Sequence, residues 1–252
     1  MKALELTSVT KDFSYNRSDQ GLLFSSLLSL VGSRTEKHTV ISDVSFILEQ
    51  GETLGIIGNN GAGKSTLLKL IAGIMQPSSG TLQAHGSVLF LGGLAHGFKQ
   101  HLTVEDNIKY IAAVFGIPAQ QSSLLVPIIL SEANLDNSRF QKMYQLSRGM
   151  RQRLAFSLTI HCAPTSNPEI VLLDEVFSKG GDVRYKVAAS KKLAEYIAAQ
   201  KTIVLVSHNL DFMRTESSRI IWLDEGSIRM DGDPERVVRA YIRANSEGAQ
   251  NE

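Results

Sequence analysis

The sequence predicts an α/β fold in which crossover helices cover a sheet, and three observations lead to this prediction. Short apolar runs rich in β-branched residues alternate with longer segments of helical periodicity. A glycine-rich loop stands directly between one apolar run and a helical stretch. Between 102 and 147 the strand pattern disappears, which indicates a helical insertion in the α/β body.

The bulk composition is that of one globular domain with a large core. The chain has 252 residues, 43% of them hydrophobic, and 26 basic side chains balance 25 acidic ones. This balance leaves no global field that draws nucleic acid or anionic lipid to the chain. The single cysteine, Cys162, cannot form an internal disulfide, and the N-terminus lacks the apolar core of a secretory signal. No apolar run approaches the roughly 20 residues that cross a bilayer, so a cytoplasmic location is expected.

Apolar runs place the strands of the predicted sheet. Strands are expected at 53–57, 169–173, 202–207, 219–223 and 227–230. The last two flank Asp224-Glu225-Gly226 and are expected to form a β-hairpin. Thr103 and Asp106 have capping-box spacing, which places a helix start at the head of the insertion.

The glycine-rich loop has the pattern G-x-x-x-x-G-K-[ST]. It consists of Gly58, Asn59, Asn60, Gly61, Ala62, Gly63, Lys64, Ser65 and Thr66. Glycines let such a loop wrap a phosphate, so that backbone N–H groups and the following helix N-terminus face its oxygens. Lys64 is expected to reach the β- and γ-phosphates of ATP, and the Ser65 hydroxyl to bind Mg²⁺. The alternative is a plain glycine-rich turn, but a strand before the loop and a helix after it favour ATP binding by Asn59 to Thr66.

Two adjacent carboxylates, Asp174 and Glu175, end the apolar run at 170–173. Burying such a pair is costly unless cations or water satisfy it. Asp174 is expected to hold Mg²⁺, while Glu175 orients and deprotonates the water that attacks the γ-phosphorus. The alternative is a strand that simply emerges into solvent at this point.

His208 follows the apolar run at 202–207 in the same way. Ligands of open α/β sheets bind at the carboxyl ends of the strands, where the glycine-rich loop, the acid pair and His208 are all expected. We expect His208 to hydrogen-bond the γ-phosphate and the attacking water. The alternative is an ordinary surface or capping histidine.

The segment from Leu146 to Leu154 opens a helical run, with Ser147 as its predicted N-cap and Gly149 allowing close approach to a phosphate. Here the chain resembles the ABC ATPase family, whose signature is L-S-G-G-Q followed by a basic helix. The resemblance covers nearly the whole chain. It implies a P-loop fold with a mixed-sheet core, an antiparallel β portion and a helical subdomain at about 102–150. It also implies that Ser147, Gly149 and Met150 bind the nucleotide of a second copy in a homodimer. The alternative is a helix cap in which the serine and the glycine occur by chance.

Details of the sequence resemble the ABC subgroup that exports cell-surface polysaccharides such as O-antigen, capsule or teichoic acid. Gly149-Met150 and the run from Arg153 to Ser157 match that subgroup's variant of the signature. The stretch 88–98 is similar to the subgroup's L-x-x-G-x-G-F motif, and it lacks the glutamine that couples nucleotide to the membrane partner in other ABC proteins. Asp182 resembles the aspartate of the D-loop, in a segment one residue longer than usual.

Near the N-terminus, an insertion at about 16–38 is longer than the ABC core requires. On a helical wheel Leu23, Leu27, Leu30 and Val31 share one face, and serines gather opposite. Such a helix either packs on the core of its own domain or lies at the membrane interface, near the entrance for a lipid-linked glycan, as in the similar subgroup.

An aromatic residue just before this insertion matches the family residue that stacks on adenine. Phe13 is the candidate, with Tyr15 as a substitute. Either can instead be an ordinary strand residue.

The resemblance implies the ATPase subunit of a polysaccharide exporter. The cofactors that the resemblance implies are ATP and Mg²⁺. The partners that it implies are a second copy, a polytopic membrane-spanning permease and the permease's lipid-linked glycan, with no nucleic acid. The subunit is expected to be peripheral on the cytoplasmic face of the inner membrane, as a single nucleotide-binding domain without a C-terminal carbohydrate-binding domain. Three alternatives stay open: a soluble ABC-type ATPase acting on ribosomes or nucleic acid, an ABC subunit for another substrate, and a P-loop kinase. Ribosome-directed relatives usually carry two cassettes or long basic insertions, and neither pattern is present.

Overall fold

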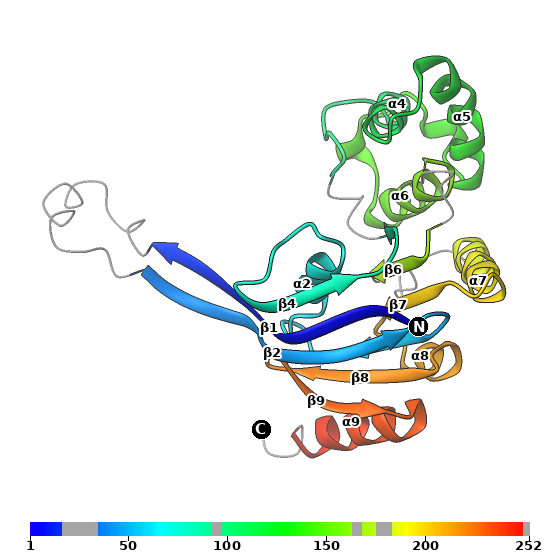
Figure 1. The fold of residues 1–252 in the computed structure, drawn as a ribbon. Coiled ribbons are helices and arrows are strands. Elements are labelled where there is room, and N and C mark those ends of the chain that lie inside the picture. The colour runs from blue at the N-terminus through cyan, green and yellow to red at the C-terminus, as the bar shows by residue number, and fades with distance from the viewer. Residues whose placement is uncertain (17–34, 92–96, 163–167, 175–182, 249–252) are drawn as a thin grey trace, which may run out of the picture.

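The computed structural model describes residues 1–16, 35–91, 97–162, 168–174 and 183–248 (Figure 1). Among them the strands form two sheets, one of three strands in the order β2-β1-β4 and one of six in the order β5-β6-β7-β3-β8-β9. The smaller sheet consists of β1 (Lys2–Asn16), β2 (Thr35–Glu49) and β4 (Ser79–Ala84). The larger consists of β3 (Thr53–Ile57), β5 (Val88–Leu91), β6 (Ile170–Asp174), β7 (Thr202–Val206), β8 (Arg219–Asp224) and β9 (Ser227–Gly232).

The larger sheet is parallel from β5 to β8, and β9 is added antiparallel to β8. All five residues of β3 and of β7 are buried, because elements cover both faces of the sheet. This explains why these strands are continuous apolar runs rather than alternating ones. The strands expected from the sequence are confirmed. Strand β3 has the predicted bounds, and β6 begins one residue after its predicted start. The predicted hairpin is β8 and β9, which pair through Asp224 and Ser227.

Helix α2 (Lys64–Ile71) is sandwiched between the two sheets, since it contacts β2 and β4 on one side and β6 and β7 on the other (Figure 1). Its apolar residues join the core that fills the space between the sheets. A second core lies on the far face of the larger sheet, under α8 (Leu210–Glu216) and α9 (Pro234–Gly248). Helix α7 (Val183–Ala198) also contacts this sheet, at β7.

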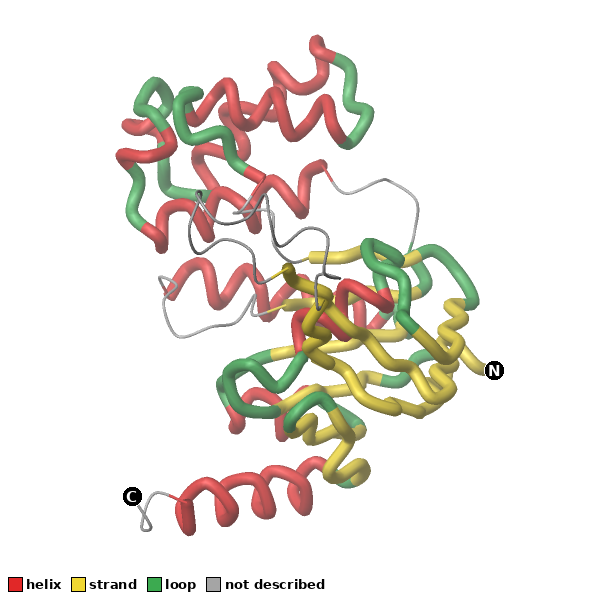
Figure 2. Tube along the Cα trace, turned by 90° about the vertical axis from the view of Figure 1, so that its left-hand side faces the viewer, coloured by secondary structure: helices red, strands yellow, loops and turns green. Residues whose placement is uncertain are grey.

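Residues 97–162 form a helical segment with a third core of its own. It contains α4 (Val104–Val114), α5 (Ala119–Glu132) and α6 (Arg148–Cys162). The capping box predicted at the head of α4 is present, because the Asp106 amide donates to Thr103 Oγ1 at 3.0 Å. Figures 1 and 2 both show the helical segment at one end of the molecule and α9 at the other.

Strands β1 and β2 run as a pair well beyond the body of the molecule (Figure 1). The last pairs of their register are Tyr15 with Glu36 and Asn16 with Thr35. The ends of the insertion expected at 16–38 are therefore strand, and the predicted amphipathic helix lies outside the described residues. Within the described ranges, none of the helices combines the length and apolar character needed to cross a membrane.

Candidate functional site

The glycine-rich loop leaves the carboxyl end of β3 and enters α2, as the sequence predicts. We call residues 58–66 the phosphate loop. Gly63, at its helix end, has φ +98°, and a Cβ added there would lie 2.7 Å from the carbonyl oxygen of Val40. Gly58 has φ +155°, and a Cβ there would lie 2.2 Å from the carbonyl oxygen of Leu223. Glycine is needed at both positions, because neighbouring backbone occupies the space that a side chain would take.

Lys64 is buried, with 7% of its surface exposed, and its ammonium group closes the phosphate loop. Its Nζ donates to the carbonyl oxygens of Gly58 at 2.8 Å and Asn59 at 2.9 Å. This places a positive charge inside a loop of backbone, beside the positive end of the α2 dipole. A loop of this form has the charge and the N–H donors that hold a phosphate.

Asp174 ends β6 beside the phosphate loop. The Ser65 hydroxyl donates to Asp174 Oδ1 at 3.4 Å, across 109 positions of the sequence. Ser65 is exposed and Asp174 is half-buried, so both oxygens are accessible. A hydroxyl and a carboxylate at this spacing suit a hard cation such as Mg²⁺.

His208 lies two residues after β7, the strand between β6 and β3. In the sheet register Val206 pairs with Asp174 on one side and with Ile56 on the other. The phosphate loop, Asp174 and His208 therefore leave neighbouring strands at one edge of the sheet. The His208 side chain is exposed there. Glu175, predicted as the base, and Asp182, predicted in the D-loop, lie outside the described residues.

The predicted signature segment lies in the helical segment, at the N-terminus of α6. Ser147 is the N-cap expected from the sequence: its Oγ accepts from the Met150 amide at 3.2 Å, and its carbonyl from the Arg151 amide at 3.1 Å. Leu146 is buried in the helical core, whereas Ser147 is exposed and Gly149 half-buried. We call Ser147, Gly149 and Met150 the signature tip. It presents a helix N-terminus to solvent.

Phe13 stands on β1, opposite His38 of β2, and is 37% exposed. The Lys11 ammonium lies 5.5 Å from its ring centroid. Two positions along β1, Lys11 pairs with Ile41, whose side chain packs against Gly63 of the phosphate loop. An accessible aromatic ring on a strand that passes the loop fits a platform for a flat base. The side chain of Tyr15 lies outside the described residues.

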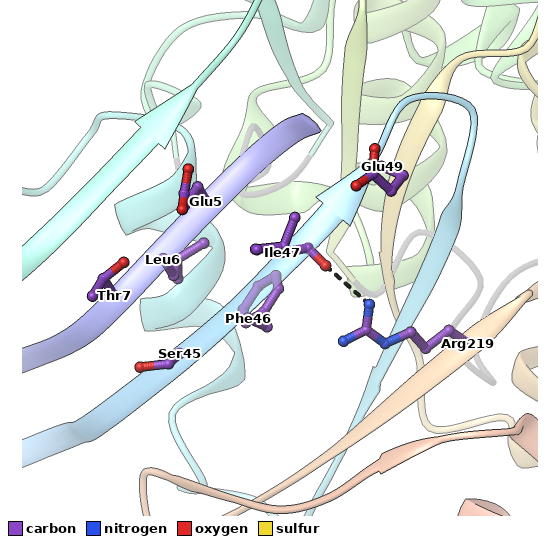
Figure 3. A pocket seen from close by; sticks show the side chains of 8 residues that line it. All are labelled: Glu5, Leu6, Thr7, Ser45, Phe46, Ile47, Glu49 and Arg219. Carbon is purple, nitrogen blue, oxygen red and sulfur yellow. Dashed lines mark hydrogen bonds between the residues drawn. The ribbon is translucent and has the colours of Figure 1, made fainter. Parts of the chain in front are cut away.

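A surface hollow of about 510 Å³ lies elsewhere, between β1, β2 and Arg219 (Figure 3). Arg219 begins β8, so the hollow is at the amino ends of the parallel strands, opposite the phosphate loop. The Arg219 guanidinium is already bound, to Asp231 at 2.6 Å and to the Ile47 carbonyl at 2.9 Å. The shallow hollow therefore offers an anion no free cation among its described lining residues, and the phosphate loop is the better candidate site.

Two residues of α9 that no sequence motif singles out contact the phosphate loop. The Tyr241 hydroxyl donates to Asn59 Oδ1 at 2.9 Å, and Asn59 Nδ2 donates to Asn245 Oδ1 at 3.3 Å. The four-residue spacing of Tyr241 and Asn245 places them on one helix face, but nothing in the sequence tells which partner that face meets.

The model of the family described as "ABC transporter" matches residues 41–178, more than half of the chain. The chain belongs to the ABC transporter family. This ABC protein is therefore a nucleotide-binding ATPase, as the phosphate loop indicates.

Curated relatives of this ABC protein have transport names. It is 33% identical over 239 residues to the teichoic acids export ATP-binding protein TagH of Listeria innocua. This match covers 95% of the chain and 69% of that relative. It is 29% identical over 245 residues to the O-antigen export system ATP-binding protein RfbB of Klebsiella pneumoniae, covering 96% and 98%. The chain spans 36% of the TagH of Bacillus anthracis. The resemblance to the polysaccharide-exporting subgroup is confirmed.

Solved structures agree on the fold of this ABC protein. An ATP-binding cassette solved as a dimer in a post-hydrolysis state, with bound ADP and Pi, superposes with a TM-score of 0.68 at 21% identity. The match covers 92% of this chain and 98% of that one. The predicted fold class is thus confirmed.

Proposed function

We propose that the chain is the ATP-hydrolysing subunit of an exporter that moves a lipid-linked cell-surface polysaccharide across the cytoplasmic membrane. The relatives with export names support the cargo class, because they match the chain over almost its whole length. The observation that carries the ATPase part is the meeting of the phosphate loop, Asp174 and His208 at one sheet edge. Two such subunits would work on the cytoplasmic face, each docked on a membrane-spanning permease.

Each residue of the site has a proposed role toward MgATP. Lys64 would exchange its two carbonyl partners for the β- and γ-phosphates. Ser65 and Asp174 would hold Mg²⁺, which neutralises charge on the phosphates. His208 would hydrogen-bond the γ-phosphate, and Glu175 would take the proton of the attacking water.

The exposed signature tip supports a shared site. A capped helix N-terminus with an accessible glycine binds phosphate well, yet in one chain it belongs to the helical segment rather than to the sheet edge. A two-fold homodimer would place the tip of each copy over the phosphate loop of the other. Each dimer would then contain two composite sites.

Mixing two inactive variants tests the shared site. Lys64→Ala removes the loop cation, and Ser147→Arg blocks the tip, so each homodimer should retain no ATP. In a heterodimer both changes fall in one composite site and the other site is intact. An equal mixture should therefore recover roughly a quarter of the wild-type sites, measured as labelled ATP retained per dimer. If mixing recovers no retained ATP, the shared-site proposal is wrong.

Purification of the tagged chain from the membranes of the cells that naturally produce it tests the export proposal. A polytopic membrane protein should co-purify with the chain, and the ATPase rate of the complex should change when the lipid-linked glycan is added. Retention on ribosomes or nucleic acid instead would contradict export and favour the soluble ATPase.

A further inference from the structure

Asn59 of the phosphate loop is held through both ends of its amide. Its Oδ1 accepts from the Tyr241 hydroxyl at 2.9 Å, and its Nδ2 donates to Asn245 Oδ1 at 3.3 Å. Asn245 is oriented in turn, because its own Nδ2 donates to the Tyr241 carbonyl at 2.9 Å. We call these three residues the Asn59 clamp. Because the Tyr241 carbonyl sets which way the Asn245 amide faces, and Asn245 Oδ1 in turn accepts from Asn59 Nδ2, the three bonds favour one orientation of the Asn59 side chain.

The α9 side of the clamp is anchored in the core. Val237 and Val238, one turn before Tyr241, are buried against the larger sheet. The Tyr241 ring meets the buried ring of Trp222 edge-on, with centroids 5.4 Å apart, and Trp222 belongs to β8, next to the strand that leads into the phosphate loop. Burial raises the pKa of Tyr241 above its usual 10, so the hydroxyl stays protonated and can donate at physiological pH.

The backbone of Asn59, like that of Gly58, also accepts a hydrogen bond from the Lys64 ammonium. Its carbonyl accepts from Lys64 Nζ at 2.9 Å and from the Ala62 amide at 3.2 Å. When a phosphate replaces the Asn59 carbonyl as an acceptor of the Lys64 ammonium, the Asn59 peptide loses one of the two hydrogen bonds that hold it in place. A clamp on the side chain keeps that peptide fixed, so less conformational freedom has to be lost on binding.

We propose that Tyr241 and Asn245 are positioning residues for nucleotide binding, and that α9 sets ATP affinity by holding Asn59. This inference rests on the proposed nucleotide site at the phosphate loop. Neither residue would touch the reacting phosphate, so they act on affinity rather than on turnover.

The test is equilibrium ATP binding together with steady-state kinetics. Tyr241→Phe removes the donor and keeps the ring against Trp222, so the fold should persist. Losing one hydrogen bond of this kind should raise the Kd and KM for ATP about 3- to 10-fold. The kcat should stay within about two-fold of wild type, because the groups at the γ-phosphate are unchanged. Asn245→Ala, on the exposed side of the clamp, should act in the same direction.

A double-mutant cycle separates positioning from general loss of stability. In an Asn59→Ala background, Tyr241→Phe should no longer change the Kd, because its acceptor is gone. Arg239→Ala is the matched control: it lies on the same helix, is 78% exposed at the side chain and pairs with Glu235 rather than with the loop. It should bind ATP like wild type.

The buried Trp222, the single tryptophan of the chain, supplies a second readout. ATP binding should change its emission through the Tyr241 contact, and Tyr241→Phe should shrink that change. The inference is overturned if Tyr241→Phe and Asn245→Ala bind ATP like wild type while Lys64→Ala does not. It is also overturned if Arg239→Ala weakens binding as much as they do. If Lys64→Ala itself binds normally, the proposed nucleotide site is what fails.

Discussion

Two glycines of the phosphate loop offer a matched pair of substitutions. Gly61 and Gly63 both have positive φ, +85° and +98°. At Gly61 an added Cβ meets no atom of the described residues within 4 Å. At Gly63 it would lie 2.7 Å from the Val40 carbonyl oxygen and 2.7 Å from Ile41 Cδ1. Backbone strain is thus common to both alanine variants, and steric overlap belongs to Gly63→Ala alone.

The backbone strain and the steric overlap each lower the free energy of unfolding by an amount that can be estimated. A left-handed conformation costs a residue with a Cβ about 1–2 kcal/mol, so Gly61→Ala should lower the free energy of unfolding by about that amount. Overpacking a rigid site adds about 1–3 kcal/mol, which brings Gly63→Ala to about 2–5 kcal/mol. The Ile41 side chain can turn aside, but the Val40 carbonyl is part of β2 and cannot, so relief is limited.

Urea denaturation without nucleotide measures both effects free of any contact with phosphate. Gly63→Ala should unfold at clearly lower urea than Gly61→Ala, with similar slopes. Equal stability of the two variants would refute the reasoning, since it would mean that the loop moves away from Val40 at no cost.

Three further predictions concern the base, an ion pair and the thiol. Glu175→Gln should lower turnover about 10²- to 10⁴-fold and leave ATP-dependent dimers that persist on gel filtration; normal turnover would exclude Glu175 as the base. Hydrogen bonds from Arg139 and Lys109 lower the pKa of Glu105 from 4.5 to about 2. Because the folded pKa is the lower one, this stabilisation is present above pH 4.5 and is lost as the pH falls toward 2. Glu105→Gln should therefore cost about 1 kcal/mol at pH 7, since the half-exposed partners are screened, and progressively less as the pH falls through the folded pKa. A cost that does not depend on pH in a denaturation series would contradict this. Burial raises the pKa of Cys162 from 9.0 to about 11, so at pH 8 iodoacetamide should alkylate it about 100-fold more slowly in the folded than in the unfolded protein, and equal rates would contradict its burial.

The sequence predicts the parallel strands well because burial on both faces leaves a simple signal. In β3 and β7 all five positions are buried, so the apolar run and the strand coincide. The antiparallel strands β1 and β2 are harder to delimit. Their register shifts repeatedly, and Ser8 and Asp43 have positive φ, so strict alternation along the chain is broken.

The candidate site can be predicted where its residues belong to a recognisable sequence motif. The phosphate loop, Asp174 and His208 follow strands whose carboxyl ends must meet in a parallel sheet, so their neighbourhood follows from the order of elements. The Asn59 clamp has no such signal. It joins positions 182 and 186 residues apart, and which side chain of α9 meets Asn59 depends on how the helix packs on β8.

The separate core of the helical segment has a mechanical consequence. Helix α6 carries Ser147 at one end and, at the other, Cys162 within that core. Most of the segment's buried apolar side chains pack among themselves, so the segment can turn as one body, and Phe156 of α6, which packs against the core under the larger sheet, is a contact that such a turn would disturb. Such a turn would move Ser147 together with the helix, and its hydrogen bonds to Met150 and Arg151 would be kept because they lie within the segment.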